Sequence, residues 1–168
     1  MAAIAGVMLS FSACTGKMET KMTDSGSNQQ KNIAASDVIM KAFETGDVNP
    51  LDSVVSEDFL DHTDRGDIRG RDSLKAMIKV MHTSFKDMKM EKVHELADDE
   101  YVHSWMRYTG TSDGTMGMPK GPYDMTAMEV SKYKDGRAIE HWGFMEMQAM
   151  TKMMAQAGAS GAESTRKK

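Results

Sequence analysis

The stretch KDGRAIEHWGFMEM, residues 134–147, carries the strongest pattern in the chain. Side chains point alternately to the two faces of a strand. One face of a strand here would hold Glu140, Trp142, Phe144 and Glu146, and the other would hold Ile139, His141, Gly143 and Met145. A packed core would exclude Glu146, and open solvent would disfavour Trp142 and Phe144. We therefore expect the first face to form the wall of a pocket.

The sequence before this stretch alternates in the same way. Residues 123–134 predict a long strand, and the Asp-Gly pair at 135–136 predicts the tight turn of a hairpin. Residues 90–110 predict two strands joined by a turn at 98–100. The Gly-rich segment 111–122 between them and the hairpin predicts a loop or a bulged excursion. The second half of the chain is thus expected to form an antiparallel sheet.

Helical patterns occupy the first half. Ser36 is a candidate N-cap for a helix that stops at Gly46, and Pro50 stands where a short second helix would start. Residues 70–85 place apolar side chains at helical spacing, namely Leu74, Met77, Ile78 and Met81. Helices followed by antiparallel strands favour an α+β fold, with about three helices packed on one face of a curved, mostly antiparallel sheet. Partial cover of such a face leaves a cone-shaped cavity.

The N-terminal segment differs from the rest. Residues 1–14 are an apolar run too short to span a bilayer, and they end in small residues and Cys14. Residues 15–35 are polar and are expected to form a flexible tether. This order resembles a bacterial lipoprotein signal, which implies lipidation of Cys14 and an exported, cell-envelope location. A cytosolic protein with a frayed N-terminus is the alternative. We expect one domain over 36–158 and a disordered tail over 159–168.

Composition excludes some classes of function. The 168 residues carry a net charge of −4 and their basic residues are scattered, which disfavours nucleic-acid binding. The single cysteine allows no disulfide within the chain. The five histidines have no spacing that suggests a shared metal site. The 19 methionines could be thioether ligands for Cu(I), but a methionine-lined cavity for an apolar or aromatic ligand is the better interpretation.

The order of elements resembles the SnoaL-like polyketide cyclase branch of the nuclear-transport-factor-2-like (NTF2-like) superfamily. The similarity runs from about residue 37 to 158, and it is carried by FLDH (59–62), GRDSLKAMIKVMHTSFKDM (70–88), YTGTSDGTMGMPKGP (108–122) and KDGRAIEHWGFMEMQAM (134–150). The resemblance implies a cone-shaped NTF2-like fold, no metal and no cofactor. It also implies a general acid/base at Glu146. Ser112 stands where those cyclases have a histidine, and Ser112 cannot shuttle protons near neutral pH.

Other aromatic and polar residues are candidates for the same pocket. Trp142, Phe144 and Trp105 are expected to be its walls, with core packing as the simpler role for Trp105. His62 is expected either at the cavity mouth or on the surface. Glu146 would be disfavoured in its charged form beside aromatic rings, which suits proton transfer. Its alternative is an exposed position at the end of the sheet.

Two functions remain open. The first is a cyclase, isomerase or hydrolase-like enzyme acting on a small hydrophobic or polyketide-like molecule, with Glu146 as general acid/base and Ser112 among the substrate-binding residues. The second is a non-catalytic ligand-binding or scaffold lipoprotein of the cell envelope. In both, the membrane is reached only through the lipid anchor. A homodimer is expected as well, because the open side of such a sheet often pairs with a second copy.

Overall fold

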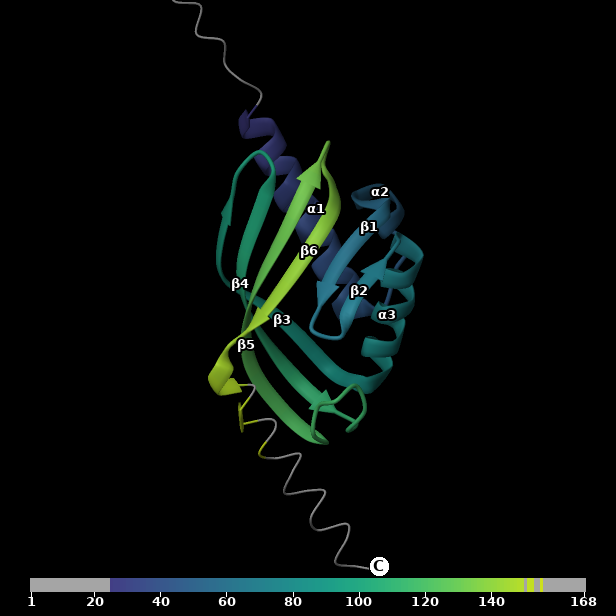
Figure 1. Cartoon of the computed structure of the whole chain (residues 1–168), viewed down its shortest axis with the longest axis vertical. Coiled ribbons are helices and arrows are strands. Elements are labelled where there is room, and N and C mark those ends of the chain that lie inside the picture. The colour runs from purple at the N-terminus through teal and green to yellow at the C-terminus, as the bar shows by residue number, and fades with distance from the viewer. Residues whose placement is uncertain (1–24, 150, 153–154, 156–168) are drawn as a thin grey trace, which may run out of the picture.

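The computed structural model describes residues 25–149, 151–152 and 155. Within these residues, helices α1 (Ser25–Thr45), α2 (Leu51–Val54) and α3 (Arg71–Ser84) accompany one six-stranded sheet (Figure 1), and residues 147–149, 151–152 and 155 are also helical. Its strands are β1 (Val55–Thr63), β2 (Gly66–Arg69), β3 (Phe85–Ala97), β4 (Tyr101–Ser112), β5 (Gly121–Lys134) and β6 (Arg137–Met145). The predicted α+β fold is confirmed.

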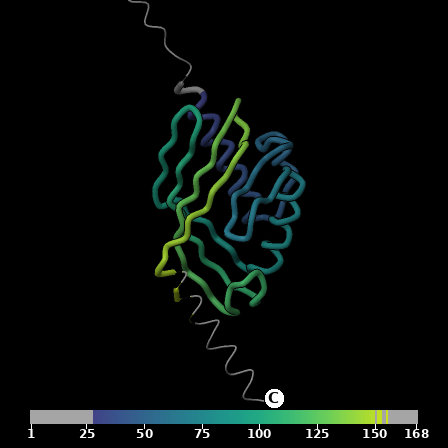
Figure 2. The backbone as a smooth tube through the Cα atoms, in the orientation of Figure 1, coloured from purple at the N-terminus to yellow at the C-terminus, as the bar shows by residue number. Residues whose placement is uncertain are grey.

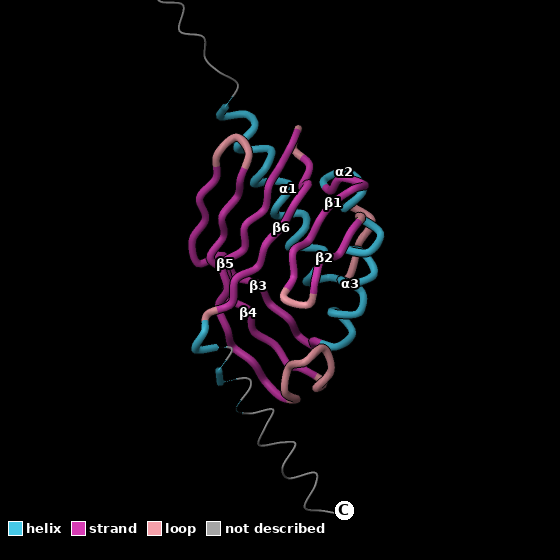
Figure 3. The backbone as a smooth tube through the Cα atoms, viewed as in Figure 1, coloured by secondary structure: helices cyan, strands magenta, loops and turns pink. Residues whose placement is uncertain are grey.

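The strand order of the sheet is β2-β1-β6-β5-β4-β3. Every neighbouring pair is antiparallel except β1 and β6, which run parallel. The long strands β3, β4 and β5 bend across the molecule, and the sheet curves around the helices, as the tube in Figure 2 shows. α1 crosses the concave face of the sheet and α3 lies at its β1–β2 side (Figure 3). The sheet therefore has a covered concave face and an open convex face.

The core lies where the three helices meet this concave face. Its fully buried side chains include Leu51, Val55, Ile78 and Val102, which come from α2, β1, α3 and β4. α3 follows the predicted pattern, since Leu74 and Ile78 are buried and Met77 packs against the same cluster. The hairpin turn also forms as predicted: Asp135 and Gly136 both have positive φ, at 53° and 74°.

The structure corrects the first half of the prediction in two places. α1 begins at Ser25 rather than at Ser36, so residues 25–35, expected in the tether, are helical. Asn32 in this added part is 1% exposed, because its side-chain amide donates to the backbone oxygens of Asp98 and Asp99 at the β3–β4 turn. Because a polar side chain makes these contacts, the sequence has no apolar periodicity here that would predict a helix over residues 25–35.

The second correction is the β1–β2 hairpin. Residues 55–63 follow the short second helix as a strand, and β1 then pairs with both β2 and β6. The register between β1 and β6 shifts between Val55 and Leu60, so apolar and polar residues do not alternate simply along β1. β3 also begins earlier than predicted, at Phe85. Cys14, segment 1–14, the tail 159–168, and Met150 and Met154 lie outside the described residues.

None of the described helices combines the length and the apolar character that a membrane span requires.

Candidate active site

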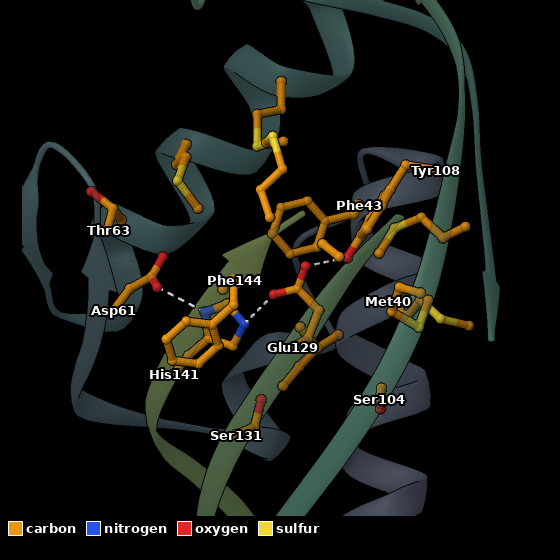
Figure 4. A pocket seen from close by; sticks show the side chains of 18 of the residues that line it. Met40, Phe43, Asp61, Thr63, Ser104, Tyr108, Glu129, Ser131, His141 and Phe144 are labelled. Atoms are coloured by element: carbon orange, nitrogen blue, oxygen red, sulfur yellow. Dashed lines mark hydrogen bonds and ion pairs between the residues drawn. The ribbon is translucent and has the colours of Figure 1, made fainter. Parts of the chain in front are cut away.

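A cavity of about 440 Å³ lies between the concave face of the sheet and the helices. Apolar side chains from α1, α3 and all long strands line most of it, and Figure 4 shows part of this lining. Methionines are the most frequent of them: Met40, Met77, Met81, Met88, Met90, Met106, Met118, Met125 and Met145. Their unbranched, polarisable side chains make an adaptable apolar wall.

One wall of the cavity carries a chain of four hydrogen-bonded polar side chains (Figure 4). The Nδ1 atom of His141 lies 2.8 Å from Oδ1 of Asp61, and its Nε2 atom lies 3.0 Å from Oε2 of Glu129. The Tyr108 hydroxyl donates to Oε1 of Glu129 at 2.6 Å. We call Asp61, His141, Glu129 and Tyr108 the acid–base cluster.

Strand pairing brings the acid–base cluster together. Asp61 of β1 and His141 of β6 are register partners in the parallel pair. Glu129 of β5 faces Gly143 of β6, and a Cβ atom at Gly143 would come within 3.0 Å of Oε2 of Glu129. The absence of a side chain at position 143 therefore leaves the room in which the Glu129 carboxylate lies. Tyr108 reaches the same carboxylate from β4.

The cluster holds His141 as an imidazolium. Both ring nitrogens have carboxylate partners, so both are placed to donate. Burial lowers the pKa of His141, but the hydrogen bonds to Asp61 and Glu129 outweigh it and raise the pKa to about 9. Burial, and next the charge of Glu129, raise the pKa of Tyr108, which stays a donor. One imidazolium between two carboxylates gives the cluster a formal net charge of −1.

Glu146 does not line this cavity. It follows β6 on the convex side, is exposed, and accepts a hydrogen bond from Thr126 Oγ1 at 2.6 Å. It borders an outer groove together with Trp105, Met128 and Phe144. Of the expected pocket wall, Phe144 borders the main cavity and Glu140, Trp142 and Glu146 do not. The other lining residues of β6 are His141, Gly143 and Met145, which belong to the second set of alternating residues.

The aromatic candidates lie mainly on the convex face. Trp142 stacks on the ring of His62, with the two centroids 4.9 Å apart, and the Nδ1 atom of His62 lies 3.0 Å from Asp67. Phe144 is 56% exposed and borders both the main cavity and the outer groove. Trp105 is 42% exposed and borders the outer groove, so neither the predicted cavity wall nor a core position describes it. The stack with His62 accounts for the position of Trp142 alone.

The two remaining candidates, His62 and Ser112, have different outcomes. His62 borders the main cavity, which is one of the two positions expected for it. Its ring stacks on Trp142. Ser112 is 1% exposed and does not border the cavity; its hydroxyl accepts from the Gly114 amide at 3.1 Å and stabilises the loop after β4. We therefore assign Ser112 a structural role in this loop.

The sequence held a signal for the residues that were missed. Along β5, the alternate residues Tyr123, Met125, Ala127, Glu129, Ser131 and Tyr133 all border the cavity. A carboxylate in the middle of such an apolar face needs a partner, and this is the signature of Glu129. Asp61 had no such signal, because the segment after the short second helix was not predicted to be a strand. Among the described residues, no group of three or more His, Cys, Asp or Glu side chains is arranged to hold a metal ion.

The curved sheet, the helices on its concave face and the cavity between them define an NTF2-like fold. A solved NTF2-like protein from Anabaena variabilis shares it, with 15% identity and a TM-score of 0.61 over 77% of this chain and 95% of that one. The family model for SnoaL-like polyketide cyclase matches residues 34–154. The chain therefore belongs to the SnoaL-like polyketide cyclase family, as the resemblance implied.

Two solved structures show the range of neighbours on this fold. IdmH from Streptomyces antibioticus, a candidate polyketide cyclase, is 25% identical, with a TM-score of 0.62 over 76% of this chain and 98% of that one. An LEH-like epoxide hydrolase from M. tuberculosis is 14% identical, with a TM-score of 0.62 over 80% of this chain and 98% of that one. No curated protein matches the sequence.

Proposed function

We propose that this protein is an enzyme that performs general acid–base catalysis on a small, largely apolar carbonyl compound bound in the methionine-lined cavity. The observation that supports it best is the acid–base cluster, which sets ionisable groups against an otherwise apolar wall. Titratable groups held in this way are typical of catalytic sites. The family match and the similarity to a candidate polyketide cyclase point to the same class of reaction.

Glu129 is the proposed general base. Its side chain is 23% exposed, whereas that of Asp61 is 8% exposed, so Glu129 is the carboxylate that a ligand reaches more easily. Each oxygen of Glu129 accepts one hydrogen bond from the cluster and keeps a further lone pair. It takes a proton from the carbon next to the substrate carbonyl, which leaves an enolate in the cavity.

His141 supplies the positive charge that this step needs. As an imidazolium it offsets the negative charge that builds on the enolate, and Asp61 keeps its ring in place through Nδ1. The enolate carbon then either takes the proton back from Glu129 or attacks a second carbonyl carbon of the same molecule, as in cyclisation. In cyclisation the new carbon–carbon bond converts that carbonyl into an alkoxide, and the alkoxide takes the proton from Glu129. Either path returns Glu129 to its ionised form.

The test is hydrogen–deuterium exchange at the carbon next to the carbonyl of 1-tetralone, a neutral bicyclic ketone, measured by NMR in D₂O. Glu129→Gln keeps the shape of the side chain and removes the base, so we expect exchange to slow by about 10²–10⁴-fold. Glu146→Gln, on the convex face, is the matched control and should stay within about twofold of the unchanged protein.

The results of this assay distinguish the proposed enzyme from the alternatives. Loss of exchange in Glu146→Gln with exchange kept in Glu129→Gln would refute the proposed site. Binding of the ketone without exchange in the unchanged protein would favour the non-catalytic ligand-binding domain. The same proton donors and acceptors would also serve in the opening of an epoxide. Hydrolysis of styrene oxide by the unchanged protein tests this reaction.

A further inference from the structure

The mouth of the main cavity lies between three segments of the chain. The end of β1 and the turn after it contribute Thr63 and Asp64 to the lining, the loop between β4 and β5 contributes Met118, and the end of β6 contributes Gly143 and Phe144. Asp64, Gly143 and Phe144 are also exposed to solvent, so the cavity reaches the surface at these residues. A ligand therefore enters beside the turn and the loop.

The loop between β4 and β5, residues 113–120, is fixed at its base by α3. The backbone amide of Asp113 donates to the backbone oxygen of Ser84 at 2.9 Å, and the Thr115 hydroxyl donates to Oγ of the same serine at 2.9 Å. Figure 3 draws the loop in pink beside the last turn of α3. The remaining part, residues 116–120, places Met118 at the cavity, and we call it the loop tip.

Arg65 in the β1–β2 turn holds the loop tip. Its Nη2 atom donates to the backbone oxygen of Met116 at 2.9 Å, across 51 residues of sequence. The guanidinium lies so close to the backbone that a Cβ atom at Gly117 would overlap Nη2. Among the described residues, no other hydrogen bond or ion pair joins the loop tip to the chain outside residues 112–121.

The loop tip can turn once this hydrogen bond is broken. Gly117 and Gly121 lie on either side of Met118, with φ at 79° and 131°. Glycine changes its backbone angles at little steric cost, so rotation at these two residues moves Met118 while the base of the loop stays on α3. The loop therefore combines hinge residues with an attachment that can be broken.

We propose that the loop tip is a gate at the mouth of the cavity and that Arg65 holds it closed. With the Arg65–Met116 hydrogen bond formed, Met118 on one side and Asp64 on the other narrow the entrance. When the bond breaks, the tip turns at its two glycines and a ligand enters or leaves. The gate controls access whether the ligand reacts or is only bound, so this inference goes beyond the proposed acid–base function.

Stopped-flow binding of N-phenyl-1-naphthylamine, a neutral dye that fluoresces more strongly in apolar surroundings, tests the gate. Arg65→Ala removes the hydrogen bond, whose value corresponds to about a 3- to 10-fold change in the population of the open gate. The association and dissociation rate constants of the dye should both rise by about that factor, so the dissociation constant should stay nearly the same. Arg69→Ala, at an exposed arginine of β2 that does not border the cavity, is the matched control and should leave both rate constants within about twofold.

Hydrogen–deuterium exchange of the backbone amides, followed by mass spectrometry, measures the gate without a ligand. The Met118 amide donates to the Thr115 oxygen within the loop, so it exchanges when the tip opens. Arg65→Ala should speed exchange in residues 116–120 by about the same 3- to 10-fold and leave α3 unchanged. If Arg65→Ala fails to fold, Arg65→Gln, which is shorter and uncharged, should change the exchange and the dye kinetics in the same direction.

Three results would overturn the gate: no binding of the dye to the unchanged protein; rate constants in Arg65→Ala equal to those of the unchanged protein; or a change in the dissociation rate constant alone, which would make Arg65 a ligand contact instead. These are binding results, so they are independent of catalysis. Glu129→Gln should lose ketone exchange but keep the dye kinetics, which separates a failure of the gate from a failure of the proposed enzyme.

Discussion

The charge state of His141 should make the stability of this protein fall in mildly alkaline solution. The pKa of His141 is about 9 in the folded protein, against an ordinary value of 6.5. Burial alone would lower it, and the hydrogen bonds to Asp61 and Glu129 reverse that effect. Because the folded pKa is the higher one, the stabilisation is complete below about pH 6.5 and is lost as the pH rises towards 9.

The size of the effect follows from the same two values. At about 1.4 kcal/mol per pKa unit, the difference corresponds to roughly 3 kcal/mol in the free energy of unfolding. This is an upper value, because the side chain of His141 is 27% exposed and solvent screens part of the interaction. Urea denaturation at intervals from pH 6 to 9.5 measures the loss, and NMR of the imidazole Cε1–H group measures the pKa directly.

Asp61→Asn gives the perturbation that tests the cause. An asparagine oxygen still accepts from Nδ1 of His141, but one negative charge is lost, so the pKa of His141 should fall and the decline in stability should start at lower pH. Asp67→Asn is the matched control, because Asp67 hydrogen bonds His62 instead. A His141 pKa at or below 6.5 in the unchanged protein, or one that Asp61→Asn leaves in place, would refute the reasoning.

Three further changes have defined outcomes. Tyr108→Phe removes the 2.6 Å hydrogen bond to Glu129 and should cost about 1–3 kcal/mol in urea denaturation; no loss would show that the bond contributes nothing net. Gly143→Ala brings a Cβ within 3.0 Å of Glu129 Oε2, so ketone exchange should fall on the order of 10-fold or more while the melting temperature changes little, and full exchange would contradict the crowding argument. Ile78→Ala should cost about 2–5 kcal/mol, because Ile78 is fully buried in α3. Val80→Ala on the same helix, where Val80 is 51% exposed, should cost less than about 1 kcal/mol, and equal costs would contradict the assigned burial.

Local patterns predicted most of the fold. α3, the four strands β3 to β6 and the Asp135–Gly136 turn all have strong periodicity or turn residues, so short-range physics decides them. β1 was missed because Pro50 and the apolar residues after it fit a helix start, and only the pairing with β2 and β6 makes the following residues a strand. Such pairing joins segments that are far apart in the sequence, so local periodicity does not predict it.

The site was predicted less well for a related reason. The alternation in 138–147 correctly separates two faces, but it does not say which face the helices cover. Trp142 suggested the wrong one, since its ring stacks on His62 and does not border the main cavity, whereas Phe144 borders that cavity and is also 56% exposed. His141 became a candidate only once Asp61, 80 residues earlier, was seen beside it.

The parallel pairing of β1 with β6 also has a consequence for biosynthesis. The ribosome makes Asp61 long before His141, so a nascent chain that lacks its final strand has this carboxylate without its cationic neighbour. Burying such a charge alone is unfavourable, so we expect the Asp61 end of β1 to pack only after β6 has been made. Assembly of the acid–base cluster should therefore coincide with the pairing of β6 with β1 rather than precede it, and C-terminal truncation before Arg137 should leave a protein in which this pair and the cluster cannot form.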